Sequence, residues 1–484
     1  MRQGILYESA DRDRFHTITV SRLESRTGES VVIHDNLKFV VPTSTNPPND
    51  IGTPGRPGFG VGYLAEAPAG FEALTGVDDP THANYGNYVY ADGSVMVWVP
   101  KFYYKMRADN SVDIKPASAY VDTIAANAAG YALHRAFIDG GSEQDGFMVD
   151  KYGCSKKAWG TGYIASSVRL GAPLSSNAAH NAISGLTACA GNYEYEFVTA
   201  AHARDGVNGA VNASSIFFCC TRFIYSALAL LSLAHGQEAT TSLHCAWWDP
   251  FGATSYPKGN NRDGVYGDVD DEQITYTSDG YTTSGSTSAL CGSAVPFART
   301  AHNGQDCGVA DLNGNMWEVS LGLTRPGANA TATGNSGTNA DFYVLKTSVA
   351  AKDLTSGHNS GLAAWGQATH LATLYDKITL PVSHLSSYML FGSGPNQVLS
   401  GATAGSGWAL TGLGIPMDAN GKSLDGANLF GKDGVYEYFR DNLCLRSGGD
   451  WSDGSTAGVW AARLSPYRSS SSVNSGFRAA CYPV

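Results

Sequence analysis

Alternating apolar and polar residues predict β-strands in several parts of the chain. Near the N-terminus, residues 15–20 and 31–41 alternate in this way and are bounded by turn-forming residues, which predicts short strands. Stronger runs over residues 95–105 and 147–152 are dominated by Val, Trp, Phe and Tyr, the residue types enriched in strands. A first helix is predicted over residues 192–204. The pattern indicates a sheet-rich chain with some helix.

Residues 214–236 form the most apolar stretch and allow two interpretations. The stretch has nearly the length of about twenty residues that spans a bilayer. Arg222 interrupts it, however, and an arginine at mid-membrane depth is costly. Ser214 and Gly236 supply the start and stop signals of a helix in a globular protein. We therefore expect a buried core helix and no membrane span.

The length of 484 residues predicts more than one structural unit. We expect a small β-rich N-terminal module over residues 1–60, which ends in a cluster of Pro and Gly. Residues 61–93 are expected to be a linker and connecting segment, and residues 94–484 the main domain. Within this domain, residues 320–440 are rich in Gly, Ala, Ser and Thr, which indicates a long insertion.

Charge and cysteine content exclude several classes of function. The net charge is −11 and only 15% of residues are charged, so the clustered Lys and Arg of a nucleic-acid surface are not expected. The nine cysteines show no C-x-x-C spacing, which argues against a zinc–thiolate site and indicates buried, reduced thiols. No apolar run follows the first residues, so no signal peptide is expected and the chain is predicted to fold in a cytoplasm.

The C-terminal stretch, residues 445–478, contains two kinds of position. One kind requires a particular backbone or pocket and forms a framework: Gly449, Trp451, Trp460, Arg468, Phe477 and Arg478. The other kind is mostly small and polar: Asp450, Ser452, Asp453, Thr456, Arg463, Ser465, Pro466, Tyr467, Ser470, Ser472, Val473 and Asn474. No helix or strand period fits this second set, so it is not the buried face of one element. A loose surface tail is the alternative, but exposing its large apolar side chains costs about 1.5–3 kcal/mol each. We therefore predict loops that display binding residues on a rigid scaffold.

Two motifs resemble a known fold. Gly448-Gly449-x-Trp451, together with Gly476-Phe477-Arg478, resembles the closing signature of the C-type lectin fold of the formylglycine-generating-enzyme type. Residues 311–318, with the sequence DLNGNMWE, resemble the other signature of that fold. The resemblance implies an α+β domain of this type with long insertions, preceded by the β-rich module.

Within that fold, the chain is most similar to the variable proteins of diversity-generating retroelements. In that family, adenines of AAY codons are randomised, and such codons cannot become Lys, Glu, Gln, Met or Trp. None of the twelve residues of the second set above is one of these five types. The resemblance implies a phage tail-fibre tip that binds a host cell-surface receptor, protein or glycan, without covalent chemistry. Tyr467 and Arg463 are expected to be its strongest contacts, because Tyr and Arg dominate binding hot spots.

The same resemblance implies partners and a location. The N-terminal module corresponds to an attachment and trimerisation module, so a homotrimer and contacts with other tail-fibre proteins are expected. The protein would be made in the host cytoplasm and carried in the virion. Neither nucleic acid nor a membrane is an expected partner. A bacterial surface or effector protein of the same fold is an alternative.

An enzyme of the same fold is the other alternative. The resembled oxidase uses copper and a pair of cysteines close to the Gly-Gly-x-Trp motif, but no cysteine lies between Cys444 and Cys481 here. A hydroxyl cannot replace a thiolate as nucleophile and soft-metal ligand. The sequence also lacks the hydrolase motifs Gly-x-Ser-x-Gly and His-Glu-x-x-His in a suitable context. We therefore predict a protein without enzymatic activity.

Calcium is the metal that the resemblance leaves under consideration once copper is set aside. Asp311, Gly314, Met316 and Glu318 match positions that form a calcium site in the enzyme family. A weaker second set consists of Asn261, Asp279 and Tyr281. Calcium takes six or more oxygen ligands. The alternative is that Asp311 and Glu318 satisfy donors within a tight turn.

Overall fold

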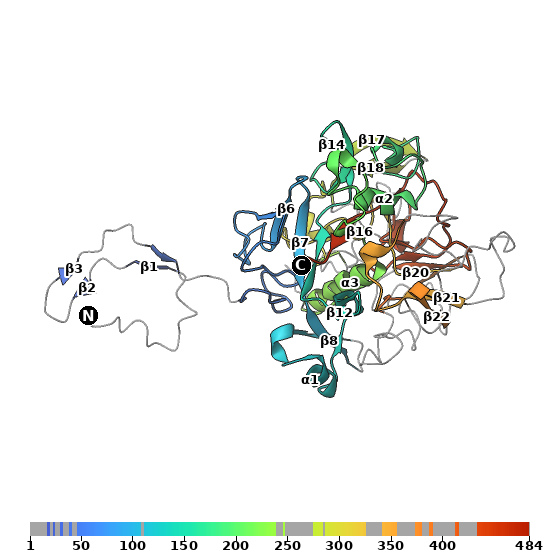
Figure 1. Ribbon diagram of the computed structural model, residues 1–484. Helices are drawn as coiled ribbons and strands as arrows, with labels where there is room; N and C mark the ends of the chain where they lie inside the picture. The colour runs from blue at the N-terminus through green and yellow to red at the C-terminus, as the bar shows by residue number, and fades with distance from the viewer. Residues whose placement is uncertain are drawn as a thin grey trace.

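The computed structural model describes the larger part of the chain. The described residues are 46–107, 111–238, 245–246, 274–283, 286–325, 341–355, 373–379, 387–390, 412–415 and 433–483, with the backbone of four short strands before residue 46. Within these residues the protein is mixed and sheet-rich, with few helices (Figure 1). This agrees with the expected α+β class.

Before residue 46, the described part of the predicted N-terminal module consists of two strand pairs. Strand β1 (Thr17–Thr19) pairs antiparallel with β4 (Lys38–Val40), and β2 (Leu23–Glu24) pairs with β3 (Ser30–Val31). Strands therefore occur within both N-terminal segments that the alternating pattern identified.

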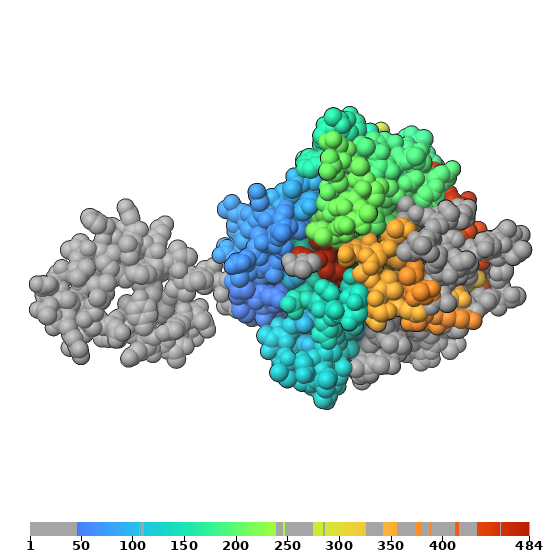
Figure 2. Space-filling view, in the orientation of Figure 1, coloured from blue at the N-terminus to red at the C-terminus, as the bar shows by residue number. Residues whose placement is uncertain are grey.

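The first of two six-stranded sheets contains the last strand of the chain, which lies second from one edge. Its order is β16 (Phe217–Cys219), β28 (Ala479–Cys481), β13 (Gly146–Asp150), β7 (Val95–Pro100), β6 (Asn87–Tyr90) and β5 (Phe71–Ala73). All neighbours in this sheet are antiparallel. In Figure 2, a patch of dark red C-terminal residues lies near the centre of the view, among segments from earlier in the chain.

The first sheet corrects the expected linker over residues 61–93. Strands β5 and β6 lie in this segment and extend the sheet beyond β7. Ile51 and Phe59 are also fully buried in the main core, so the main domain includes residues that the sequence analysis assigned to the N-terminal module. The Gly- and Pro-rich composition concealed these residues, because it signals turns whether the turns join separate domains or lie within one.

The second six-stranded sheet gathers strands from the predicted insertion and the C-terminal stretch. Its order is β23 (Ser387–Leu390), β24 (Gly434–Glu437), β26 (Ala462–Arg463), β25 (Arg446–Ser447), β19 (Trp317–Val319) and β27 (Ser475–Gly476). The pairs β24–β26 and β19–β27 are parallel, and the others are antiparallel. The segment over residues 320–440 thus contributes two strands beside the C-terminal stretch.

Small sheets and helices complete the described fold. The small sheets contain β8 (Phe102–Met106), β9 (Val112–Pro116) and β10 (Ala132–Leu133); β11 (Ile138–Asp139) and β12 (Ser142–Glu143); β14 (Ser155–Trp159) and β15 (Gly162–Ser166); β17 (Ser278–Thr283) and β18 (Ser286–Ala289); and β20 (Leu323–Thr324), β21 (Asp341–Leu345) and β22 (Tyr375–Thr379). The α-helices are α1 (Thr123–Ala128), α2 (Glu196–His202) and α3 (Arg222–Gln237). Short 3-10 helices are η3 (Ala117–Ala119), η4 (Arg135–Phe137), η5 (Ile183–Gly185), η6 (Val207–Gly209), η8 (Phe297–Thr300), η9 (Ala351–Asp353) and η10 (Gly454–Thr456).

Helix α3 is the core helix expected from the apolar stretch, but it begins later. The side chain of Thr221 caps it by accepting a hydrogen bond from the Ile224 N–H at 3.2 Å. The residues around Ser214 do not start the helix, because Phe217–Cys219 pairs with β28 instead. Every residue from Arg222 to Gly236 is buried. In the described part of the chain, no helix has both the length and the apolar character needed to cross a membrane.

The charge of Arg222 is accommodated at the first turn of α3. Its guanidinium donates hydrogen bonds to four backbone carbonyl oxygens, those of Leu413, Gly414, Trp460 and Ala461, and to the Ser447 hydroxyl. Buried charge is tolerated when its donors are satisfied in this way. The arginine that interrupts the apolar stretch thus links α3 to β25 and to the backbone preceding β26.

Buried ion pairs join the first sheet to the end of the chain. Arg204, which is fully buried, contacts Asp92 at 3.0 Å and Asp150 at 2.7 Å. Asp150 also accepts a hydrogen bond from the Ala479 N–H at 2.7 Å. Arg478 pairs with Glu318 and donates to the Asp150 carbonyl at 3.0 Å. These contacts tie β13, β19 and β28 together.

We predict that Arg204→Met strongly destabilises the protein. The substitution leaves Asp92 and Asp150 buried without their cation, which should lower the free energy of unfolding by about 3–5 kcal/mol. Urea-induced unfolding followed by tryptophan fluorescence measures this loss. The control is Arg107→Met, because the Arg107 side chain is 55% exposed in its pair with Asp113, and less than about 1 kcal/mol should be lost. Equal losses in the two variants would contradict the prediction.

Candidate functional site

The twelve sequence-predicted binding residues lie on three segments: the turn after β25, the stretch from β26 onward, and the loop before β27. Tyr467 is 44% exposed and Ser452 is also exposed. Eight others are partly buried: Asp453, Thr456, Arg463, Ser465, Ser470, Ser472, Val473 and Asn474. The structure buries Asp450 and Pro466, so these two side chains differ from the expected surface set. Ten of the twelve residues thus retain contact with solvent.

The framework residues behave differently from this set. Trp451, Trp460, Arg468, Phe477 and Arg478 are all buried, as a supporting framework requires. The ring of Phe477 stacks on Phe197 from α2, with centroids 4.9 Å apart. The two kinds of position that the sequence distinguishes therefore differ in burial.

One face of the second sheet carries a row of aromatic and arginine side chains. Tyr388 on β23, Tyr436 on β24 and Arg463 on β26 are cross-strand partners. The rings of Tyr388 and Tyr436 meet edge to face at 5.0 Å, and the Arg463 guanidinium lies 5.4 Å from the centre of the Tyr436 ring. The alternate residues Val435 and Ala462 are buried in the core on the other face. Strand alternation therefore directs the row away from the core.

The row continues past the end of β24 and meets the exposed Tyr467. The Arg440 guanidinium lies 4.6 Å from the ring centre of Tyr438 and 5.5 Å from that of Tyr467. Its Nε donates to the Ser465 carbonyl at 2.6 Å. Cation–π contacts of this kind hold planar groups in fixed orientation. We call Tyr388, Tyr436, Arg463, Tyr438, Arg440 and Tyr467 the tyrosine–arginine face.

A pair of carboxylates lies at the edge of this face. The Tyr388 hydroxyl donates to Asp453 at 2.9 Å, and the second oxygen of Asp453 accepts the Asp450 N–H at 2.8 Å. Asp450 accepts hydrogen bonds from the N–H and hydroxyl of Ser452, each at 2.6 Å, and from the Asn474 amide. Burial, and then the nearby Asp453 charge, raise the pKa of Asp450 to about 7. Burial also raises the pKa of Asp453. The two carboxylates therefore hold the backbone of the turn after β25 and also determine its charge.

The turn that holds Asp450 depends on two glycines. Gly448 and Gly449 have φ values of 94° and 91°, in the left-handed region that favours glycine. A Cβ on Gly448 would lie 2.4 Å from the Tyr225 hydroxyl. A Cβ on Gly449 would lie 2.5 Å from the Cβ of Ala457. The Gly-Gly-x-Trp motif is therefore required by the path of the backbone.

The main chain of residues 471–475 is held from outside this loop. The N–H and the carbonyl of Ser472 both bond the Ser176 hydroxyl, at 2.9 and 3.2 Å. The carbonyl of Val473 lies 2.8 Å from Nδ1 of His180. The carbonyl of Asn474 accepts the Trp317 N–H at 2.9 Å. None of these bonds uses the side chain of residue 472, 473 or 474, so this part of the backbone support stays available when those side chains change. The side chains of Ser472 and Asn474 add bonds of their own, to each other and from Asn474 to Asp450.

The proposed calcium ligands do not fit a bound cation. Both carboxylate oxygens of Glu318 accept hydrogen bonds from Arg478, and Asp311 accepts the Gly292 N–H at 2.7 Å. The guanidinium beside Glu318 also repels a cation at this place. Among the described residues, no group of three His, Cys, Asp or Glu side chains gathers as metal ligands. The set of Asp311, Gly314, Met316 and Glu318 is thus better explained by internal hydrogen bonding.

The weaker second set leads to a different arrangement. Asn261 lies outside the described residues, whereas Asp279 and Tyr281 on β17 both contact His180. Burial raises the pKa of Asp279, but hydrogen bonds, that from His180 first, outweigh burial and lower it overall. Asp279 and Tyr281 thus hold His180, which bonds the loop over 471–475. Among the described residues they are not part of a group of oxygen ligands around a metal site.

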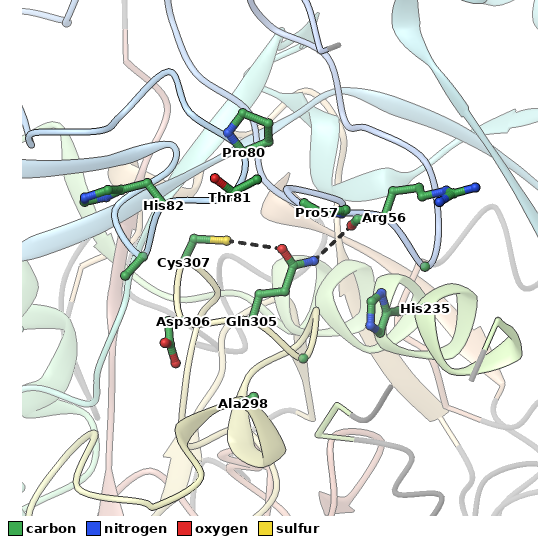
Figure 3. A pocket seen from close by; sticks show the side chains of 13 residues that line it. Arg56, Pro57, Pro80, Thr81, His82, His235, Ala298, Gln305, Asp306 and Cys307 are labelled. Atoms are coloured by element: carbon green, nitrogen blue, oxygen red, sulfur yellow. Dashed lines mark hydrogen bonds between the residues drawn. The ribbon is translucent and has the colours of Figure 1, made fainter. Parts of the chain in front are cut away.

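A cavity of about 380 Å³ lies apart from the tyrosine–arginine face, between the loops over 55–57, 80–83 and 304–307 (Figure 3). Figure 3 shows Arg56 and His82 pointing away from each other at opposite ends of it. Gln305 in the middle accepts the Gly58 N–H at 2.7 Å and donates to the Arg56 carbonyl at 3.1 Å. The Gln305 amide thus holds the loop over 55–58 and does not point into the cavity as a free binding group.

All nine cysteines are free and buried, as the sequence analysis predicts. Burial raises the pKa of the Cys444 thiol well above its ordinary value, and that of Cys219 likewise. A protonated, inaccessible thiol is a poor nucleophile and a poor metal ligand.

The sequence matches no model of a known protein family and has no significant match among curated proteins. Similarity to a characterised protein therefore supplies no function for this site.

Sequence reasoning missed several residues of this region. Tyr388, Tyr436, Tyr438 and Arg440 fall in the segment taken as an insertion. The sequence of residues 435–440, VYEYFR, contains a signal, because Tyr436, Tyr438 and Arg440 occupy every second position, as on one face of a strand. His180 had no such signal, because its partners are distant in the sequence.

We predict that Asp450 makes stability depend on pH. Its pKa is raised from about 3.9 in the unfolded chain to about 7, so the folded protein binds the proton more tightly. Stability should therefore fall as pH rises from about 4 to about 7. In Asp450→Asn this loss should shrink by on the order of 1 kcal/mol or more. Urea midpoints across this pH range measure the effect, with the exposed Asp145→Asn as control; parallel curves for wild type and Asp450→Asn would rule it out.

Proposed function

We propose that the protein is a recognition protein whose C-terminal surface binds a host cell-surface receptor without covalent chemistry. In this proposal it is the tip of a phage tail fibre and a variable protein of a diversity-generating retroelement. The ligand contacts the tyrosine–arginine face and the loops around it. Tyr467 and Arg463 make the strongest contacts, because Tyr and Arg contribute most to binding hot spots, Tyr467 is exposed and Arg463 is partly exposed.

The observation that carries the proposal is the external support of the loop over 471–475. Ser176, His180 and Trp317 bond its main chain, and none of them belongs to the C-terminal stretch. A protein that exchanges side chains to change its ligand needs a backbone that does not follow each exchange. This separation of backbone support from side-chain display supports a diversified binding surface over a fixed catalytic site.

The arrangement of the two motifs supports the finer fold assignment in this proposal, a C-type lectin fold of the formylglycine-generating-enzyme type. Glu318 of one motif pairs with Arg478 of the other. The Trp451 N–H donates to the Asn315 carbonyl at 3.3 Å. The motifs are thus joined in space although more than a hundred residues separate them, as signatures of a single fold should be.

A tail-fibre tip carries several copies of its binding surface. Individual contacts through small polar side chains can therefore be weak, since linked copies raise the effective affinity by about 10²–10⁴. The homotrimer and the attachment role of the N-terminal module belong to this proposal. They do not affect the assignment of the binding surface.

The enzyme alternative predicts reactive thiols, and our proposal predicts none. Because all nine cysteines are buried, the native protein should react with Ellman's reagent by less than about one thiol in the time in which the unfolded protein reacts completely. The unfolded chain is the control for total thiol content. Rapid reaction of two native thiols, together with stoichiometric copper(I) binding, would favour the oxidase.

We predict that displayed and framework residues differ in their effect on stability. The triple variant Tyr467→Ala, Ser472→Ala, Val473→Ala should lose less than about 1.5 kcal/mol of unfolding free energy, because its side chains are at least partly exposed. Trp460→Ala alone should lose about 3–5 kcal/mol, because the ring is fully buried. Urea unfolding of both variants decides the comparison. A triple variant as unstable as Trp460→Ala would refute the separation of display from support.

The coding locus provides the direct test of the retroelement. We expect a near-copy of the DNA that encodes residues 445–478, with AAY codons at displayed positions, beside a reverse transcriptase gene. DNA sequencing of the locus checks this. A locus without such a repeat would favour a bacterial surface or effector protein of the same fold, and the stability comparison above would still stand.

A further inference from the structure

His180 is bonded at both ring nitrogens to groups that only accept hydrogen bonds. Nδ1 lies 2.8 Å from the carbonyl oxygen of Val473, and Nε2 lies 2.7 Å from a carboxylate oxygen of Asp279. A carbonyl and an ionised carboxylate have no proton to donate. Both nitrogens must therefore carry a proton for both bonds to form, which makes the ring an imidazolium.

Two other buried histidines show the contrast. His134 Nδ1 accepts the Ala136 N–H at 3.1 Å, and His302 Nδ1 accepts the Val309 N–H at 3.0 Å. Each of these rings has one accepting nitrogen and is therefore neutral. Burial lowers the pKa of His134 to about 3 and that of His302 to about 4, in agreement with this proton count.

The surroundings of His180 hold the charged ring in place. The ring is 5% exposed and stacks on Tyr281, with centroids 4.3 Å apart and an angle of 20° between planes. Trp451 of the framework approaches edge-on at 5.8 Å. The Asp279 side chain is 1% exposed and supplies the opposite charge. A buried cation needs such a hydrogen-bonded partner.

We propose that His180 is a positioning residue that, as an imidazolium paired with Asp279, fixes the main chain of the loop over 471–475 beneath its exchangeable side chains. The importance of this loop for recognition rests on the proposed function. The clamp itself, from β17 through the ring to the Val473 carbonyl, stands on the contacts alone. It acts on a backbone atom, so it operates whichever side chain residue 473 has.

Loss of the ring proton should release one of the two bonds. The neutral ring can donate to Asp279 or to Val473, but not to both. The titratable groups that the structure places around this point are Asp279 and Tyr281 on β17, and Asp450, which reaches the same loop through Asn474. The loop should therefore become less ordered when His180 is deprotonated, and Asp450 must be controlled for.

The test is a long-range ¹H–¹⁵N spectrum of histidine-labelled full-length protein, recorded as pH is raised in an Asp450→Asn background. His180 should give the imidazolium pattern, with two protonated nitrogens, while His134 and His302 give neutral patterns in the same sample. A neutral His180 ring throughout the range in which the loop is ordered would overturn the proposal.

Two variants provide an independent readout. His180→Phe keeps a ring against Tyr281 but removes both hydrogen bonds, and exchange of the Ser472 and Trp317 amides should be about tenfold faster or more. His180→Phe with Asp279→Leu also removes the unpaired carboxylate, and the acceleration should persist. Unchanged exchange in both variants would refute the clamp. Because no ligand is used, failure of receptor binding would count against the proposed function only.

Discussion

The buried ion pairs around the end of the chain are the constraint on which the described fold depends. Arg478 pairs with Glu318 on the second sheet and bonds the backbone of Asp150 on the first. Asp150 in turn holds Arg204 and the backbone of β28. Each charge is enclosed, so its partner has to be present and correctly placed. Both sheets and the C-terminal stretch are thereby brought into one arrangement.

That arrangement separates support from display. The second sheet turns Val435 and Ala462 into the core and Tyr436 and Arg463 away from it. The loops at its edge are then held through backbone atoms by residues from elsewhere in the chain. Asp450, Asp453 and Asn474 are exceptions, because their side chains bond the turn after β25 or link the loop over 471–475 to it. Among the twelve predicted binding residues these three also act as support, and exchanging them should alter the turn itself.

Features that depend on neighbouring residues could be predicted from the sequence, whereas features that depend on residues far apart in the chain could not. Local patterns identified the strands near residues 95–105 and 147–152, the core helix and the buried framework tryptophans. The residue types and the spacing of apolar positions within each short segment are enough to predict these features. The start of α3 was misplaced because Phe217–Cys219 is equally suited to a strand, and only its pairing with β28 decides. Strands β5 and β6 were hidden by turn-rich flanks. His180 and Ser176 could not be found, because their partners lie nearly 300 residues away.

The position of β28 has a consequence for how the protein is made. This strand lies between β13 and β16, so β16 cannot join the other four strands of the first sheet until residues 479–481 have left the ribosome. A product that stops or shifts frame within residues 445–478 lacks those residues and exposes the edges of β13 and β16. Such incomplete chains should be less stable and more readily degraded than the complete protein.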